Sequence, residues 1–285
     1  MARILRLDLS FDGTDFLGWQ RQPEGRTVQA EVEAALARIL GTPHRVVGAG
    51  RTDTGAHAAA MVASCATDAT MPAQELARAL DAVLPPDVGV LAVRDAEPGF
   101  HALRDARWKW YRYSVLNTPR RRPLERRRTW HVRTRLDRAV LEDGAAALAG
   151  THDFRAFANQ GSPRKTTVRT LYGLRWVGTS GDRLDLDVVG DGFLYRMVRA
   201  IVGTLVDWAR SPAHLAACGP GHGAAEAVRF LLASGDRAAA GPVAPATGLC
   251  LRAVGLVGGA RAGGLPPFLP PGVESDRRAS PGGLS

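Results

Sequence analysis

The chain opens with an alternation of apolar and polar side chains. In residues 5–11, LRLDLSF, leucine or phenylalanine occupies every second position, which is the two-residue period of a half-buried strand. Residues 28–40 instead repeat apolar side chains every three or four positions, so they predict a helix with Thr27 as its N-cap and Gly41 after its end. Similar patterns predict strands at residues 45–47, 59–66 and 89–93, and a helix at 72–84.

The second half of the chain repeats this order of elements. It predicts a strand at 108–116, a helix at 136–150 that Gly150 ends, and an irregular polar loop at 151–166. There follow a hairpin of residues 167–177 and 183–189, an apolar helix at 191–209, a helix at 224–233 and a strand at 248–256. Each half therefore reads β-α-β-β-α-β, the order of a ferredoxin-like unit. We expect an α+β fold in which two such units form one extended mixed sheet with a central cleft.

This order also divides the chain into predicted domains. Residues 1–103 form an N-terminal α/β subdomain, and residues 104–257 form a C-terminal one. From residue 258 onward glycine, proline and serine dominate, so we expect residues 258–285 to be a mobile tail.

Positive charge is concentrated in one segment, residues 104–138. This basic segment holds 13 of the 37 Arg and Lys residues and only three Asp or Glu, in a chain of formal net charge +9. Aromatic side chains stand among the cations, and such a stripe is typical of proteins that bind and stack on nucleic acids. The chain has only two lysines, so it prefers arginine throughout, but that preference does not explain the clustering. We therefore predict nucleic-acid binding here, with Arg107 and Lys109 among the contacts.

Several other functional classes are excluded by what the sequence lacks. Three widely spaced cysteines argue against a disulfide framework or a zinc cluster and indicate a reducing compartment. No apolar stretch is long enough to span a membrane, and the first residues lack the apolar region of a signal peptide. No Walker A loop, Gly-x-Ser-x-Gly elbow or complete dinucleotide motif occurs. We expect a cytoplasmic protein with no metal and no membrane association.

One acidic residue, Asp53, stands in a glycine-rich frame, GAGRTDTGAHA at 48–58. Arg51 precedes it by two positions, and residues i and i+2 of an extended segment point to the same side. A nearby arginine favours the ionised carboxylate that a nucleophile needs. The spacing therefore allows a catalytic carboxylate, but it also allows a turn in which Asp53 caps its own backbone, or a surface ion pair.

The segment GRTDTGAHA resembles the motif GRTDAGVHA of the A-type tRNA pseudouridine synthases. Further blocks resemble that family in the same order: FDGTDFLGWQRQ, FHALRDARWKWYRYSVLN, GTHDFRAFANQ, TVRTL, GFLYRMVRAIVG and APATGLCLRAV. These blocks reach residue 255, so the resemblance covers everything but the tail. It implies an isomerase that converts uridines 38, 39 and 40 in the anticodon stem-loop of tRNA after flipping the target base.

The resemblance also implies roles for five residues. Asp53 matches the nucleophilic aspartate, and Arg51 matches the arginine that holds the target nucleotide and moves it out of the stack. Tyr111 matches the tyrosine that packs against the flipped base, and Arg199 matches the arginine paired with the aspartate. Leu249 matches an apolar wall beside the base. Taken as residues alone, Tyr111 and Leu249 also suit a hydrophobic core, and Arg199 also suits a helix surface.

The implied reaction breaks and remakes a glycosidic bond with nothing gained or lost, so it needs no cofactor. Members of the family are generally homodimers that bind one tRNA across both subunits. Two other functions stay open: a noncatalytic RNA-binding protein on the same scaffold, and a hydrolase of glycosidic bonds, which normally needs a second carboxylate. The chain departs from the family at Leu103, where arginine is usual and where Arg104 follows instead.

Overall fold

The structure is a computed structural model that describes residues 3–159, 166–177, 181–218, 223–264 and 266. Within these ranges the chain forms six α-helices and eleven strands. It divides into two compact units: unit 1 contains residues 3–109 and 251–264, and unit 2 contains the described residues of 110–250 together with residue 266. The α+β class with a mixed sheet is confirmed. The predicted domain boundary at residue 103 stays a prediction.

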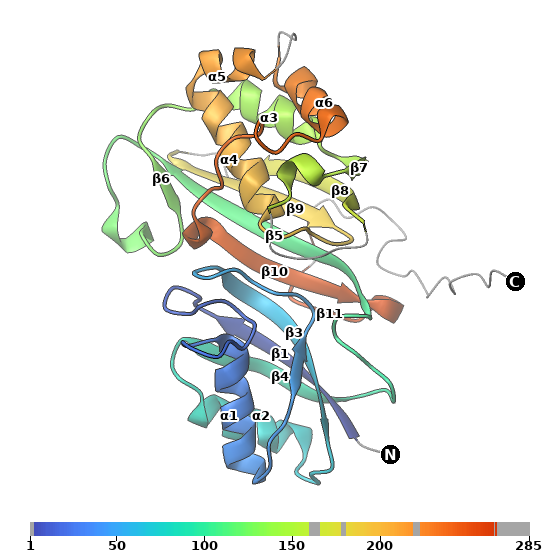
Figure 1. Ribbon diagram of the computed structural model, residues 1–285. Coiled ribbons are helices and arrows are strands. Elements are labelled where there is room, and N and C mark those ends of the chain that lie inside the picture. The colour runs from blue at the N-terminus through green and yellow to red at the C-terminus, as the bar shows by residue number, and fades with distance from the viewer. Residues whose placement is uncertain (1–2, 160–165, 178–180, 219–222, 265, 267–285) are drawn as a thin grey trace, which may run out of the picture. The chain divides into compact units, whose positions relative to one another are not determined.

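Unit 1 is built on an antiparallel sheet whose central strand is β1 (Arg3–Phe11), which pairs with β3 and β4 (Figure 1). The order of its elements, β-α-β-β-α-β, is as predicted. They are β1, α1 (Val28–Leu40), β2 (Val46–Gly48), β3 (His57–Thr67), α2 (Ala73–Val83) and β4 (Val88–Ala96). Helix α1 has the predicted ends, because the Thr27 hydroxyl accepts from the Ala30 amide at 3.4 Å and Gly41 adopts a left-handed φ of 76°.

Both faces of β1 are buried, whereas its alternating sequence predicts that only one is. The apolar face behaves as expected, since Leu5, Leu7 and Leu9 are completely buried. On the other face Arg6 and Asp8 are also buried, and they form an ion pair of 2.7 Å between Arg6 Nε and Asp8 Oδ1. A guanidinium nitrogen of Arg6 also donates to the Arg261 carbonyl at 2.6 Å. Burial of these two charged side chains is tolerated because each forms an ion pair with the other and Arg6 has a further hydrogen-bond acceptor.

Arg261 belongs to a short strand, β11 (Arg261–Ala262), which pairs with β10 (Leu249–Leu256). Strand β11 lies inside the segment predicted to be a tail. Residues 258–264 of that segment belong to unit 1. Residue 265 and residues 267–285 of the predicted tail lie outside the described residues.

Unit 2 is a sheet with the strand order β5-β9-β8-β7, and helices α3, α4, α5 and α6 lie together over one of its faces (Figure 1). Strand β6 pairs in parallel with β5. The strands are β5 (Ala106–Asn117, which begins in unit 1), β6 (Trp130–Val132), β7 (Gly150–Asp153), β8 (Val168–Val177) and β9 (Arg183–Gly190). The helices are α3 (Arg138–Ala147), α4 (Met197–Arg210), α5 (Pro212–Ala217) and α6 (Ala224–Ser234).

Three details of unit 2 correct the sequence-based expectations. Helix α3 ends at Ala147, and Gly150 starts strand β7 where a polar loop was expected. This strand exists because β8 pairs with it, and the hydroxyls of Thr151 and Thr170 bond across the pair at 2.8 Å. Helix α4 begins at Met197 rather than near residue 191, because Arg196 has a left-handed φ of 58°. Residues 160–165 of the expected loop and 178–180 of the expected hairpin turn lie outside the described residues.

Candidate active site

Asp53 lies in the loop that joins β2 to β3, residues 49–56, here called the Asp53 loop. It is held against the loop that follows β1, residues 12–19, here called the N-terminal loop. Two backbone hydrogen bonds join them: the Trp19 amide donates to the Thr52 carbonyl, and the Gly55 amide donates to the Phe16 carbonyl, both at 3.2 Å. These bonds flank Asp53 in sequence, so the backbone on both sides of the carboxylate is fixed.

The Asp53 loop closes in a turn at the candidate nucleophile. The Ala56 amide donates to the Asp53 carbonyl at 3.0 Å, and Gly55 has a φ of 77°, which favours glycine. Asp53 is half-buried at the start of this turn, and Arg51, two residues before it, is exposed. A turn is therefore present at Asp53 and is closed by a backbone hydrogen bond, whereas a cap made by the Asp53 side chain stays a prediction.

The two loops are packed so closely that one position excludes any side chain. A Cβ placed on Gly13 would lie 1.9 Å from the carbonyl oxygen of Ala56 and 2.6 Å from its carbonyl carbon. The Gly13 backbone therefore supports the turn directly. Reasoning from the sequence did not assign a function to Gly13, although the FDGTDFLGWQRQ block contains it.

Lys109, on β5, is a predicted residue from outside the Asp53 loop that the fold of unit 1 brings to it. A Cβ placed on Gly50 would lie 3.2 Å from Lys109 Cε, so the lysine stem passes over the start of this loop. Arg107 precedes it by two positions on β5, and alternate residues of a strand share a face. Arg107 is half-buried, and its buried Nε has no hydrogen-bond acceptor among the described residues.

Unit 2 holds the remaining predicted residues. Tyr111 is buried, and its ring meets that of Phe193 edge to face, with 5.1 Å between centroids and 87° between planes. Phe193 lies in the GFLYRM block, but the sequence did not single it out. Leu249, the first residue of β10, is also buried.

Arg199 stands in the first turn of α4, where its Nε donates to the Ala244 carbonyl at 2.7 Å. The Ala244 amide in turn donates to the Arg199 carbonyl at 3.0 Å. Burial raises the pKa of the nearby Tyr113 hydroxyl, and the positive charge of Arg199 opposes that effect. The Tyr113 hydroxyl donates to the Pro245 carbonyl at 2.7 Å. Arg199 is thus part of a polar cluster with the segment before Leu249, not an isolated surface cation.

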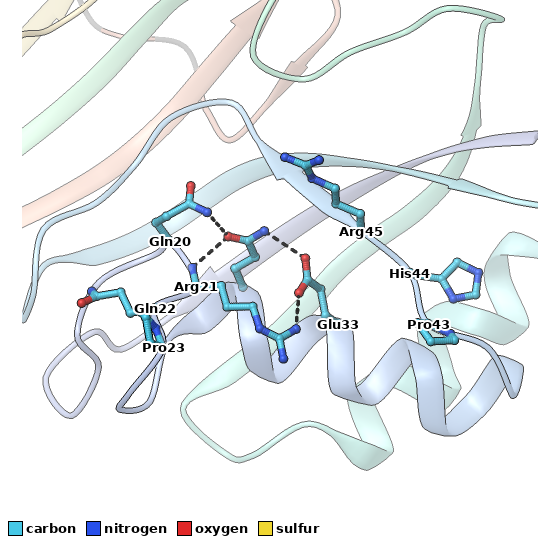
Figure 2. A pocket seen from close by; sticks show the side chains of 9 residues that line it. Gln20, Arg21, Gln22, Pro23, Glu33, Pro43, His44 and Arg45 are labelled. Atoms are coloured by element: carbon cyan, nitrogen blue, oxygen red, sulfur yellow. Dashed lines mark hydrogen bonds and ion pairs between the residues drawn. The ribbon is translucent and has the colours of Figure 1, made fainter. Parts of the chain in front are cut away.

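A pocket on the outer side of α1 contains none of the predicted site residues (Figure 2). Its floor is polar, because buried Glu33 accepts from Arg21 Nη1 at 2.8 Å (Figure 2). Glu33 also accepts from the Val46 amide at 3.1 Å. Buried Gln29 donates to Glu33 Oε1 at 2.9 Å, the oxygen that also accepts from the Val46 amide, and it accepts from the Gln20 side chain at 2.8 Å. This network joins residues 20–21, which follow the N-terminal loop, to β2, the strand that leads into the Asp53 loop.

The fold and these groups define an α+β protein whose unit 1 presents a carboxylate on a fixed loop, with the stem of Lys109 over the start of that loop. The profile of the tRNA pseudouridine synthase family matches residues 9–107 and 145–255 of this chain. The chain is 42% identical over 249 residues to tRNA pseudouridine synthase A of Pelobacter propionicus, an alignment that covers 87% of this chain and 98% of the relative. It is 43% identical over 254 residues to the protein of that name from Syntrophotalea carbinolica, with 88% and 95% covered.

The chain therefore belongs to the tRNA pseudouridine synthase family, which is a family of isomerases. Asp53 and Arg51 lie in the first matched range, and Arg199 and Leu249 lie in the second. Lys109 and Tyr111 lie between the two ranges. Along the part of the chain that the structure describes, no helix is long and apolar enough to cross a membrane, and no group of three potential metal ligands occurs.

Proposed function

We propose that this protein converts uridines 38, 39 and 40 of the tRNA anticodon stem-loop to pseudouridine, with Asp53 as the nucleophile. The observation that carries the proposal is the position of Asp53: a half-buried carboxylate in the GRTD motif, in a loop whose backbone is fixed on both sides. Fixed geometry matters because a group held close to its target reacts far faster than one that must find it.

In the proposed reaction the target base first leaves the RNA stack, which costs a few kcal/mol. Asp53 then attacks the nucleoside, and the bond between the ribose and N1 of uracil breaks. The uracil rotates and C5 bonds to the ribose, and the bond between Asp53 and the nucleoside breaks, which frees the carboxylate. The hydrogen on C5 leaves as a proton and N1 takes up a proton from solvent. One proton is lost and one is gained with no change of oxidation state, so the proposal includes no cofactor.

The other predicted residues act on the RNA and the flipped base in this scheme. Arg51, exposed beside Asp53, moves and holds the target nucleotide, and Arg107 and Lys109 bind phosphates near it. Tyr111 packs against the flipped base, which supplies part of the stacking that the RNA loses.

Two groups complete the site. Leu249 forms an apolar wall beside the base, and Arg199 pairs with the catalytic carboxylate. The bond from Arg199 Nε to the Ala244 carbonyl supports this role, because it restricts the orientation of the guanidinium. We further propose that the protein is a cytoplasmic homodimer that binds one tRNA across both subunits, as is general in the family.

The test compares wild type, Asp53→Asn and a control, Asp68→Asn, on a tRNA transcript labelled with tritium at uracil C5. Asp68 is an exposed aspartate just after β3, so its amide should change neither fold nor reaction. We expect wild type and the control to release tritium, and Asp53→Asn to bind the tRNA without releasing it. Release of tritium by Asp53→Asn at the rate of the control variant would refute the role of Asp53 as the nucleophile. RNA binding without release by any of the three would support the noncatalytic alternative, and free uracil would support hydrolysis.

A further inference from the structure

His57, the first residue of β3, is almost completely buried at the end of the Asp53 loop. Its imidazole Nδ1 lies 3.1 Å from the Gly13 amide nitrogen and 3.1 Å from Asp12 Oδ1. A neutral imidazole accepts the Gly13 N–H at Nδ1, and one protonated at Nδ1 donates to the Asp12 carboxylate. In both states the same ring atom bonds the same turn of the N-terminal loop.

The Asp12–Gly13 turn is also held by hydrogen bonds that do not involve His57. The Asp12 carboxylate accepts from the Thr14 amide at 3.1 Å and from the Thr14 hydroxyl at 2.6 Å. The Asp12 amide donates to the Asp87 carbonyl at 2.9 Å, just before β4. His57 therefore bonds to a support that does not depend on the Asp53 loop.

We infer that His57 is a positioning residue for the reaction: its Nδ1 fixes the end of the Asp53 loop to the Asp12–Gly13 turn and so fixes the carboxylate of Asp53. This inference rests on the proposed role of Asp53. The bonds at Thr52 and Gly55 restrain the loop beside Asp53, and the Nδ1 contact of His57 restrains its exit into β3 together with the pairing of Ala58 and Phe11. His57 directly follows Ala56, so we expect loss of the Nδ1 contact to let Ala56 and the turn move relative to Gly13.

A buried histidine can also be a filler of the core, so the test must separate volume from hydrogen bonding. Asparagine places a polar atom where Nδ1 stands, whereas glutamine, longer by one methylene, places its amide near the position of Nε2. Phenylalanine keeps the ring and removes both nitrogens. If His57 acts through Nδ1, then His57→Asn restores function, and His57→Gln and His57→Phe do not.

The experiment measures tritium release in a single turnover at saturating tRNA, together with the Kd for the same tRNA. We expect His57→Phe and His57→Gln to lower the rate roughly 10-fold to 100-fold, as displacements of about 1 Å do in other enzymes. Their Kd should change less than about twofold, because the basic segment is untouched. We expect His57→Asn to keep the rate within about fivefold of wild type. Equal rates for the asparagine and glutamine variants would overturn the inference, even if His57→Phe does not fold.

Hydrogen exchange tests the contact of His57 Nδ1 with the Asp12–Gly13 turn independently of catalysis. Amides of residues 51–56 should exchange at least about tenfold faster in His57→Gln than in wild type or His57→Asn, which corresponds to about 1.4 kcal/mol of local stability. Unchanged exchange would overturn the inference. If exchange rises but Asp53→Asn remains active, the proposed nucleophile fails while the structural role of His57 stands. The two failures are therefore distinguishable.

Discussion

Replacing Gly13 with alanine is expected to displace the Asp53 loop and slow the reaction. The new Cβ would lie 1.9 Å from the Ala56 carbonyl oxygen, and Cβ atoms in proteins essentially never approach an atom closer than 3.0 Å. The loops must therefore separate by at least about 1.1 Å, because the obstructing atom belongs to the backbone and cannot rotate away. Ala56 is three residues from Asp53 and bonds to its carbonyl, so Asp53 moves with it.

The expected consequence is a loss of roughly 100-fold in the single-turnover rate, since a 1 Å misplacement can cost that much. Overpacking should also lower the free energy of unfolding by about 1–3 kcal/mol. Affinity for tRNA should stay within about twofold, because the phosphate contacts of the basic segment are distant in sequence and chemically unchanged.

The assay is tritium release from C5-labelled tRNA at saturation, with urea unfolding measured on the same preparation. Gly264→Ala is the matched control, because a Cβ there meets no atom within 4 Å. The control should retain the wild-type rate and stability. If Gly13→Ala releases tritium at more than half the wild-type rate with unchanged stability, the loop contact does not position Asp53 and the reasoning is wrong.

Three further predictions concern stability and reactivity. Asp187→Ala should lower the free energy of unfolding in urea by about 3–5 kcal/mol, because the completely buried Asp187 binds the Arg112 guanidinium at 2.7 and 2.8 Å; a loss below about 1 kcal/mol would contradict this. Burial raises the pKa of the Cys65 thiol to about 11, so iodoacetamide at pH 8 should alkylate it only after unfolding, as mass spectrometry would show. The Thr167 hydroxyl lowers the pKa of Asp153 below its ordinary value of 3.8, so this contribution to stability is present above pH 3.8 and is lost as pH falls through the folded-state pKa. Thr167→Val should therefore destabilise the protein more at pH 7 than at pH 2, and equal losses of urea midpoint would contradict that sign.

Local patterns in the sequence determined most of the elements. The alternation in β1, the helical period of α1 and the hydroxyl and glycine at the two ends of that helix are properties of neighbouring residues. They can be read without knowing what packs against them. Asp53 was found in the same way, because the GRTD motif is contiguous and its glycines mark a constrained turn.

Tertiary structure alone decided which segments support that turn. Gly13 and Ala56 are 43 positions apart, and nothing in either segment specifies the close approach that leaves no room for a Cβ on Gly13, or the Nδ1 contact of His57. Strand β7 likewise has a polar sequence and exists because β8 supplies its hydrogen bonds. The Arg6 side chain, which the alternation predicts to be exposed, is buried and donates to the carbonyl of Arg261, 255 positions further along the chain. Hydrogen bonds and close packing between distant segments leave no periodic trace in either of them, so only the folded chain reveals them.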